Sequence, residues 1–208
     1  MKRLIPDLGL NSAEGYDEIF AVRAIKGVDE HDLRRWKKLL KFYKGGRFID
    51  LGCLDSLAPV IVKEQYPREE VWGIDIAKEA IAEMSRKYPF QGLFYQVGDV
   101  YDTRFPDNYF SYAIAGEIME HLDDPEKFIC ETMRILKRGA TLAVSVTLGE
   151  EKEVGAVDGD RHVWSYDVED AYKLFGKYGK VTTKTTGSDY VPKYVYRWPT
   201  LYIYVRKD

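Results

Sequence analysis

The feature that most constrains the fold is a short apolar run that ends in an acid and passes directly into a glycine turn. It spans residues 48–56, with the sequence FIDLGCLDS, and Asp50 closes the apolar part. Gly52 follows, and Asp55 and Ser56 are residues that commonly open a helix. A buried strand, a tight turn and a helix N-terminus in close succession are the arrangement with which open α/β sheets hold nucleotide-like ligands. This stretch therefore predicts a parallel sheet with a ligand site at its strand ends.

Outside this stretch, apolar runs of strand length alternate with segments of helical periodicity. The predicted strands are residues 48–51, 71–75, 93–97, 109–115, 141–147, 181–186 and 200–205. The predicted helices between them are residues 56–65, 77–87, 124–139 and 167–178. Strands separated by helices pair in parallel, whereas the last two strands follow one another without a helix. The pattern predicts an α/β fold of the Rossmann-like, doubly wound type, with a mostly parallel seven-stranded sheet and an antiparallel edge strand.

Two amphipathic helices are predicted ahead of the sheet. Ser12 is a candidate N-cap of the first, which carries Tyr16 on its apolar face, and the second starts near Asp29. The glycine pair at 45–46 is expected to end the second helix. Leading helices of this kind commonly cover the ligand, so Tyr16 could contact it, although packing on the sheet is the simpler interpretation.

Length and composition suit one domain. A chain of 208 residues with 45% apolar residues can bury a substantial core, and it contains neither repeats nor a low-complexity linker. We therefore expect a single domain, residues 1–208, in which residues 1–44 form N-terminal cover helices and residues 45–208 form the Rossmann-like core.

The charge balance limits the partners that the protein is expected to have. The net charge of −3 and the pI near 5.8 argue against a protein whose main task is to bind nucleic acid. One basic segment, residues 34–41 (RRWKKLLK), is the exception. We interpret it as the solvated face of an amphipathic helix, with a local phosphate-binding patch as the alternative.

Cysteine usage and apolar runs indicate the compartment. Cys53 and Cys130 are too few for a disulfide framework, which favours a reducing environment. Pro6 and Asp7 interrupt the apolar core that an N-terminal signal needs, and no apolar run is long enough to span a bilayer. We expect a cytoplasmic protein without a membrane partner, and the sequence leaves its oligomeric state open.

Acids and glycines follow the predicted strands in a regular order. The motifs are Asp50-x-Gly52, Asp75, Gly98-Asp99, Glu117-x-x-Glu120-His121 with Asp124-Pro125, and Lys137-Arg138-Gly139-Ala140. Together they resemble the class I S-adenosylmethionine-dependent methyltransferases of the small-molecule type, the group that includes the ubiquinone-biosynthesis O-methyltransferases. The resemblance covers residues 45–180 and implies S-adenosyl-L-methionine as the cofactor.

The resemblance also implies cofactor contacts at the strand ends. Asp75, which comes 25 residues after Asp50, stands where such folds place a carboxylate on the ribose hydroxyls. Asp99 would accept a hydrogen bond from the adenine amino group, and the backbone N–H of Val100 would donate to a ring nitrogen. The full set of expected cofactor-binding residues is Asp50, Leu51, Gly52, Asp75, Ile76, Asp99, Val100, Ala115 and Gly116.

Two departures from the family pattern keep other functions in consideration. Leu54 and Ser56 stand where the family usually has glycines. A nicotinamide-dependent oxidoreductase is disfavoured, because the pyrophosphate of a dinucleotide needs a glycine at the position of Leu54. The remaining alternative is a catalytically inactive methyltransferase-like binding module, because leucine is penalised in the left-handed backbone conformations that glycine adopts freely.

The segment after the fourth strand carries the candidate catalytic residues. Glu117, Glu120 and His121 are spaced i, i+3 and i+4, so a helical turn would gather them on one face. With the distant His162, they resemble a divalent-metal site of small-RNA 2′-O-methyltransferases and some quinone O-methyltransferases. We do not favour a metal, because many relatives carry a similar segment only to line the cofactor pocket. We expect His121, His162 and Glu117 to be catalytic, with a histidine as the metal-free base.

The methyl acceptor is expected to be a hydroxyl or amino group of a small molecule. The chain is acidic and lacks the motifs of amide and cytosine methylation. The aromatic residues that could line an acceptor pocket are Trp164, Tyr190, Tyr194, Tyr196 and Trp198. Packing at the edge of the sheet is the simpler interpretation for most of them.

Overall fold

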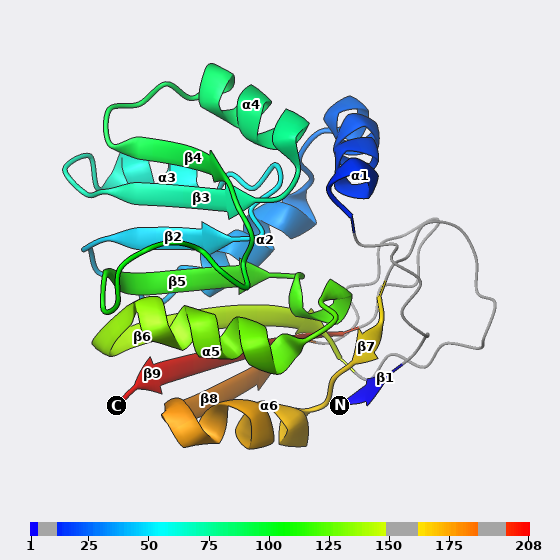
Figure 1. Cartoon of the computed structure of the whole chain (residues 1–208), viewed down its shortest axis with the longest axis vertical. Helices are drawn as coiled ribbons and strands as arrows, with labels where there is room; N and C mark the ends of the chain where they lie inside the picture. The colour runs from blue at the N-terminus through cyan, green and yellow to red at the C-terminus, as the bar shows by residue number, and fades with distance from the viewer. Residues whose placement is uncertain (4–11, 149–161, 187–198) are drawn as a thin grey trace.

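Seven strands form one mixed sheet in the order β4-β3-β2-β5-β6-β9-β8 (Figure 1). The computed structural model describes residues 1–3, 12–148, 162–186 and 199–208. The strands of the sheet are β2 (Phe48–Leu51), β3 (Val71–Asp75), β4 (Leu93–Val97), β5 (Phe110–Gly116), β6 (Leu136–Thr147), β8 (Gly179–Thr185) and β9 (Thr200–Lys207). The chain proceeds outward from β2 to β4 and then restarts at β5 on the other side of β2. This reversal creates a switch point between β2 and β5, where open α/β sheets bind ligands.

The direction of pairing agrees with the prediction of a mostly parallel sheet with an antiparallel strand at one edge. β2, β3, β4, β5 and β6 pair in parallel, whereas β9 runs antiparallel to both β6 and β8. Because β9 inserts between β6 and β8, the antiparallel strand lies one position inside the edge. A separate two-stranded antiparallel ladder joins β1 (Lys2–Arg3) to β7 (Trp164–Ser165).

Helices cover both faces of the sheet. The helices are α1 (Ala13–Lys26), α2 (Glu30–Leu39), α3 (Ala58–Gln65), α4 (Lys78–Lys87), α5 (Pro125–Ile135) and α6 (Val168–Phe175), with short 3₁₀ turns η1 (Met119–His121) and η2 (Gly176–Tyr178). In Figure 1, α5 and α6 lie in front of the sheet, and α2 and α3 lie behind it. Two clusters of buried side chains fill the two interfaces, one containing Phe128 and Phe175 and the other containing Trp36 and Val62.

Several predicted helix ends differ from the structure, including that of α6, which ends at Phe175 rather than at residue 178. α2 ends at Leu39, well before the glycine pair at 45–46. α3 starts at Ala58, because the Ser56 hydroxyl accepts a hydrogen bond from the Ala58 N–H at 3.1 Å ahead of the first turn. α5 ends at Ile135 and passes directly into β6, so the helix predicted to continue to residue 139 is too long. The Lys207 ammonium caps this end by donating to the Leu136 carbonyl at 2.6 Å.

The first helix stands apart from the sheet, near the ends of the strands. Figure 1 shows α1 beside α4, at the side where the arrows of β3 and β2 point. The Glu79 N–H donates to the Asp17 carboxylate at 2.9 Å and joins the two helices. None of the helices in the described part of the chain combines the length and apolar character needed to cross a membrane.

Candidate active site

A cavity of about 400 Å³ opens where β2, β3, β4 and β5 end. Asp50, Asp75 and Asp99 line it from three successive strand ends, because parallel strands bring their carboxyl ends to the same edge of the sheet. Tyr16 of α1 and Arg35 of α2 also line it. The volume is within the range of small-molecule sites, roughly 300–1,000 Å³.

The turn after β2 is held against β3 by backbone hydrogen bonds. The N–H groups of Gly52 and Cys53 donate to the Ile74 carbonyl at 2.8 and 3.0 Å. Gly52 has a φ of +72°, and a Cβ at this position would lie 2.2 Å from the Ile118 side chain. Leu54 has a φ of +40°, in the left-handed region that disfavours leucine. Glycine is therefore required at position 52, whereas Leu54 accepts backbone strain.

Asp75 links this turn to the start of α4. One carboxylate oxygen accepts a hydrogen bond from the Leu54 N–H at 2.8 Å, and the other accepts one from the Ala77 N–H at 2.9 Å. Burial raises the pKa of the carboxyl, and the backbone N–H groups of Ala77, Leu54 and Ile76 oppose that rise. Each oxygen has a second lone pair, so a carboxylate in this position can also accept bonds from a ligand.

Asp50 presents a buried acceptor that the protein does not satisfy. The residue is 2% exposed, it lines the cavity, and its Oδ2 has no hydrogen-bond partner in the structure. Burial raises its pKa to about 7, against the opposing effect of the hydrogen bond from Ser56. A buried carboxylate oxygen without a partner is costly, so this atom suits a cationic or hydrogen-donating ligand group.

Arg35 is a site residue that the sequence analysis did not identify. The sequence predicts a solvated face for segment 34–41, and Arg34 is indeed exposed, but the Arg35 side chain is only 13% exposed and lines the cavity. Its guanidinium pairs with Asp32 at 2.7 Å. The signal was the spacing of Asp32, Trp36 and Leu39, which are buried at i, i+4 and i+7 and therefore share one face of α2.

The remaining cofactor-binding candidates divide into two groups. Ile76, Asp99, Val100 and Gly116 line the cavity together with the residues described above. Leu51 and Ala115 are fully buried in the hydrophobic core and are not among the described residues of the cavity wall. Their assignment as cofactor-binding residues stays a prediction, and the contact would come from the backbone, because side chains on buried parallel strands alternate between two packed faces rather than facing the strand end.

Glu117 does not begin a helical turn. Its φ is +54° and its N–H donates to the Ser145 carbonyl at 2.9 Å, so the 3₁₀ turn η1 starts only at Met119. The prediction that Glu117, Glu120 and His121 share one helical face is wrong, because the positive φ turns Glu117 out of helical register. Glu117 instead lines the cavity, with a buried Oε1 that has no hydrogen-bond partner.

Glu120 faces the interior rather than the cavity. It is 0% exposed, its Oε1 accepts a hydrogen bond from the Thr147 N–H at 3.2 Å, and its carbonyl accepts one from the Val163 N–H at 2.7 Å. Burial, and then the neighbouring Glu117, raise the pKa of the Glu120 carboxyl well above its ordinary value. Glu120 therefore joins η1 to the end of β6 and to the start of β7.

The two candidate histidines lie against each other at the cavity. The rings of His121 and His162 meet edge to face with centroids 4.7 Å apart, and the Tyr16 ring meets His121 in the same way at 6.2 Å. His121 lines the cavity, whereas His162 is not among the described residues of its wall. The structure therefore brings both histidines together but exposes only His121 to the cavity.

The geometry does not support the metal group considered from the sequence, which comprised Glu117, Glu120, His121 and His162. In the part of the chain that the structure describes, the ligand atoms that lie within 4.8 Å of one another belong to Asp29, His31 and Asp32. Asp29 caps α2 by accepting the Asp32 N–H at 2.9 Å, so these acids already have structural roles.

Most of the aromatic residues expected at the acceptor pocket lie outside the described residues, namely Tyr190, Tyr194, Tyr196 and Trp198. Trp164 is described, and its indole N–H donates to the Leu122 carbonyl at 2.7 Å. Because Leu122 lines the cavity, Trp164 supports the wall through this contact.

An open α/β sheet with three acids at neighbouring strand ends around one cavity has the class I methyltransferase fold. The methyltransferase domain family matches residues 49–144. A chain from the complex between the Haloferax volcanii Trm112 methyltransferase activator and a methyltransferase has a TM-score of 0.74, with 18% identity over 93% of this chain and 98% of that chain. Phosphoethanolamine N-methyltransferase 2 of Haemonchus contortus, in complex with S-adenosyl-L-methionine, has a TM-score of 0.70, with 15% identity over 97% of this chain and 58% of that chain.

Sequence relatives agree with this class. The ubiquinone/menaquinone biosynthesis C-methyltransferase of Desulfotalea psychrophila is 27% identical over 110 residues, which are 51% of this chain and 45% of that protein. Ajmaline N-methyltransferase of Rauvolfia serpentina is 31% identical over 105 residues, which are 49% of this chain and 36% of that protein. The chain spans about half or less of the length of the curated relatives it matches. The chain thus matches the methyltransferase domain family over residues 49–144 and has the fold of the class I S-adenosylmethionine-dependent methyltransferases.

Proposed function

We propose that the protein transfers a methyl group from S-adenosyl-L-methionine to a hydroxyl or amino group of a small molecule. The observation that carries the proposal is the convergence of Asp50, Asp75 and Asp99 on one cavity of about 400 Å³. The named relatives include C- and N-methyltransferases, so an amino acceptor has direct parallels among them. The expected cytoplasmic, reducing location is in keeping with the free thiols of Cys53 and Cys130.

The residues of the cavity fit the chemical groups of the cofactor. Asp75 would hold the ribose hydroxyls and Asp99 the adenine amino group. The unsatisfied oxygens of Asp50 and Glu117 suit the ammonium of the methionine end, and the guanidinium of Arg35 suits its carboxylate. When bound, S-adenosyl-L-methionine supplies a methyl group on a sulfonium centre that is open to in-line displacement.

The catalytic roles that we propose belong to His121 and Glu117, with His162 in support. His121 would accept the proton of the acceptor group, since its ring lies on the cavity wall. Glu117 would orient the acceptor or cofactor through its buried carboxylate oxygen. His162 would hold the His121 ring in place through their edge-to-face contact.

A catalytically inactive binding module is the second candidate, and the strained backbone of Leu54 is the observation that favours it. The turn nevertheless keeps Asp75 bonded at the cavity edge. Binding of the cofactor without methyl transfer to any hydroxyl or amino acceptor would support the inactive module over the enzyme.

The decisive experiment is calorimetric titration with S-adenosyl-L-methionine and with 5′-methylthioadenosine, which lacks the amino-acid end. Asp75→Asn should weaken both ligands by on the order of tenfold to a hundredfold, because it removes a charged acceptor from the nucleoside part. Arg35→Lys should weaken only S-adenosyl-L-methionine, because lysine keeps the charge beside Asp32 but lacks the guanidinium fork. Arg34→Lys and Asp102→Asn, both at exposed positions, are the matched controls. Failure of the unaltered protein to bind either ligand at millimolar concentration would overturn the proposal.

A further inference from the structure

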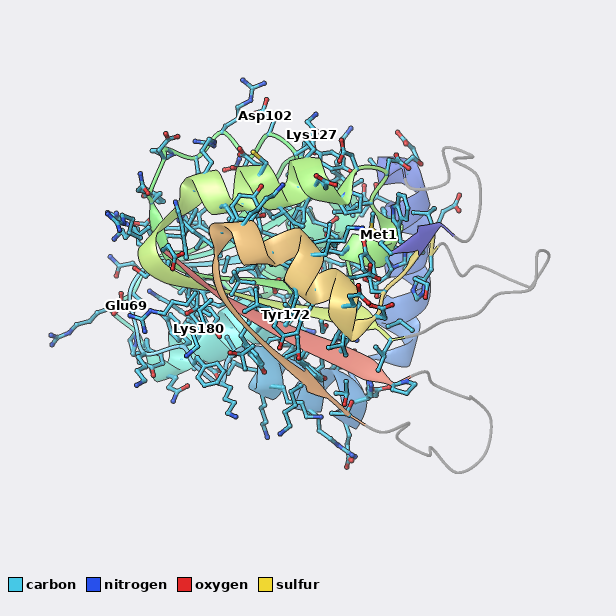
Figure 2. The ribbon with its side chains drawn as sticks, turned by 90° about the horizontal axis from the view of Figure 1, so that it is seen from below. Met1, Glu69, Asp102, Lys127, Tyr172 and Lys180 are labelled. Atoms are coloured by element: carbon cyan, nitrogen blue, oxygen red, sulfur yellow. The ribbon has the colours of Figure 1, made fainter. Side chains whose placement is uncertain are left out.

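A cluster of cations on the side of the sheet that carries α2 has no role in the proposed reaction. Six exposed or half-buried cations form what we call the basic face: Lys37, Lys38, Lys41, Lys180, Lys184 and Arg206. They come from α2 and the turn after it, from β8 and from β9. Figure 2 shows that α2 lies on the opposite side of β9 from α6, so these elements meet on one surface.

Contacts between side chains show that the basic face is continuous. The Lys38 ammonium lies 5.1 Å from the centre of the Tyr202 ring, and the Tyr204 hydroxyl donates to the Lys38 carbonyl at 2.8 Å. In the β8–β9 ladder, Lys184 lies opposite Tyr202 and Lys180 lies opposite Arg206. Residues directly opposite in an antiparallel pair point to the same face, so both lysines extend the surface that begins at α2.

The chain segments that supply these cations contain no acid. The sequence contains no aspartate or glutamate in residues 33–49, 176–188 or 190–207, which include all six cations. Among the described residues, none of the six forms an ion pair, whereas neighbouring Arg34 and Arg35 pair with Glu30 and Asp32. A protein with a net charge of −3 thus gathers uncompensated positive charge on one side.

A large apolar side chain lies among these cations. Phe42 is 43% exposed, its ring packs edge to face on Tyr204 with centroids 4.8 Å apart, and the Lys41 ammonium lies 5.1 Å from its centre. None of the six cations lines either of the two described cavities. The lysines of the basic face are point charges without the planar fork with which arginine reads phosphates and bases.

We propose that the basic face docks on an anionic phospholipid surface, with Phe42 entering the headgroup layer and the surrounding lysines contacting lipid phosphates. Lysines around an exposed aromatic side chain match the chemistry of interfacial binding. The sequence led us to expect no membrane partner because no segment can span a bilayer, but surface attachment requires no span.

The test is co-sedimentation with two kinds of vesicle, at low and at high salt. One kind contains phosphatidylcholine alone, and the other contains roughly one third phosphatidylserine in phosphatidylcholine. The unaltered protein should bind only the anionic vesicles, and salt at about 1 M should release it, because the Debye length then falls to about 3 Å. The triple variant K41E/K180E/K184E should lose binding by on the order of a hundredfold, given about fivefold for each charge near the surface. The control variant K87E/K127E/K173E has the same net charge and exposed positions on other elements, and it should bind like the unaltered protein.

A second pair of variants separates Phe42 from general surface hydrophobicity. Phe42→Ala should weaken vesicle binding by about tenfold, the expected loss for an aromatic side chain that leaves the interface. Phe94→Ala is the matched control, because Phe94 is also 43% exposed but lies on β4, at the other edge of the sheet. Circular dichroism before each assay checks that every variant is folded. The proposal would be overturned if the unaltered protein did not bind anionic vesicles, or if both triple variants lost binding equally. It would also be overturned if the protein bound a short nucleic-acid duplex but not the vesicles.

Discussion

The backbone N–H of Leu54 donates a hydrogen bond of 2.8 Å to Oδ2 of Asp75. A residue that departs from the glycine pattern of the family therefore contacts the acid at the end of the next strand. The backbone of Leu54 makes this contact while it lies in the left-handed region, at a φ of +40°. The strained position thus also supplies one of the hydrogen bonds that hold the Asp75 carboxylate.

Substitution of Leu54 by glycine and by alanine should separate strain from side-chain loss. Both variants remove most of the side chain, but only glycine adopts a φ of +40° without steric cost. Leu54→Gly should therefore be more stable than Leu54→Ala by about 1 kcal/mol in urea unfolding. Equal stability of the two variants would show that position 54 is not strained in solution.

Asp50 should make stability depend on pH. Its pKa is about 7 in the folded protein against an ordinary value of 3.8, so the folded state binds more protons than the unfolded state between those values. The contribution of Asp50 to the free energy of unfolding therefore falls as the pH rises from 3.8 to about 7. Asp50→Asn should abolish this loss. The stability of the variant relative to that of the unaltered protein should therefore increase by about 2–3 kcal/mol between about pH 5 and pH 8. Urea unfolding at both pH values measures the difference, and Asp102→Asn, at a half-exposed position, should show little of it.

Glu120 should tolerate glutamine but not alanine. Burial keeps its carboxyl protonated above its ordinary pKa of 4.5, and glutamine has nearly the same shape as the protonated acid and keeps an acceptor for the Thr147 N–H. At about pH 6, Glu120→Gln should lie within about 1 kcal/mol of the unaltered protein, and it should become the more stable of the two as pH rises, because only glutamate then ionises in the interior. Glu120→Ala should cost about 2 kcal/mol or more through the cavity and the lost acceptor. The prediction would be contradicted if thermal unfolding showed Glu120→Gln to be as destabilised as Glu120→Ala.

The two histidines should differ in their effect on turnover. His121→Ala should lower kcat by on the order of a hundredfold or more without changing cofactor affinity, because it removes the proposed base. His162→Ala should have a smaller effect, because His162 acts through the ring of His121. Transfer of a labelled methyl group to a panel of phenols and amines measures both. A larger loss of turnover with His162→Ala than with His121→Ala would contradict the assignment of His121 as the base. A parallel loss of turnover and cofactor binding with His121→Ala would contradict it as well.

Local sequence signals were sufficient to predict the bounds of three strands whose ends form the cavity. β2, β3 and β4 have the predicted bounds, because short apolar runs between turn residues leave little freedom in placement. The acids Asp50, Asp75 and Asp99 could be assigned to one edge of the sheet for the same reason, since successive parallel strands point their carboxyl ends the same way. The chain by itself therefore determined the sheet and the acidic rim of the cavity.

Side-chain orientation depended on contacts between segments distant in the sequence. Arg35 reaches the cavity because Trp36 and Leu39 bury α2 against the sheet, and Glu120 turns inward because Thr147 on β6 offers it a hydrogen bond. The backbone of Glu117 leaves helical register through its bond to Ser145. Residue spacing describes only neighbours along one element, whereas these orientations follow from packing between elements, so only the tertiary structure decided them.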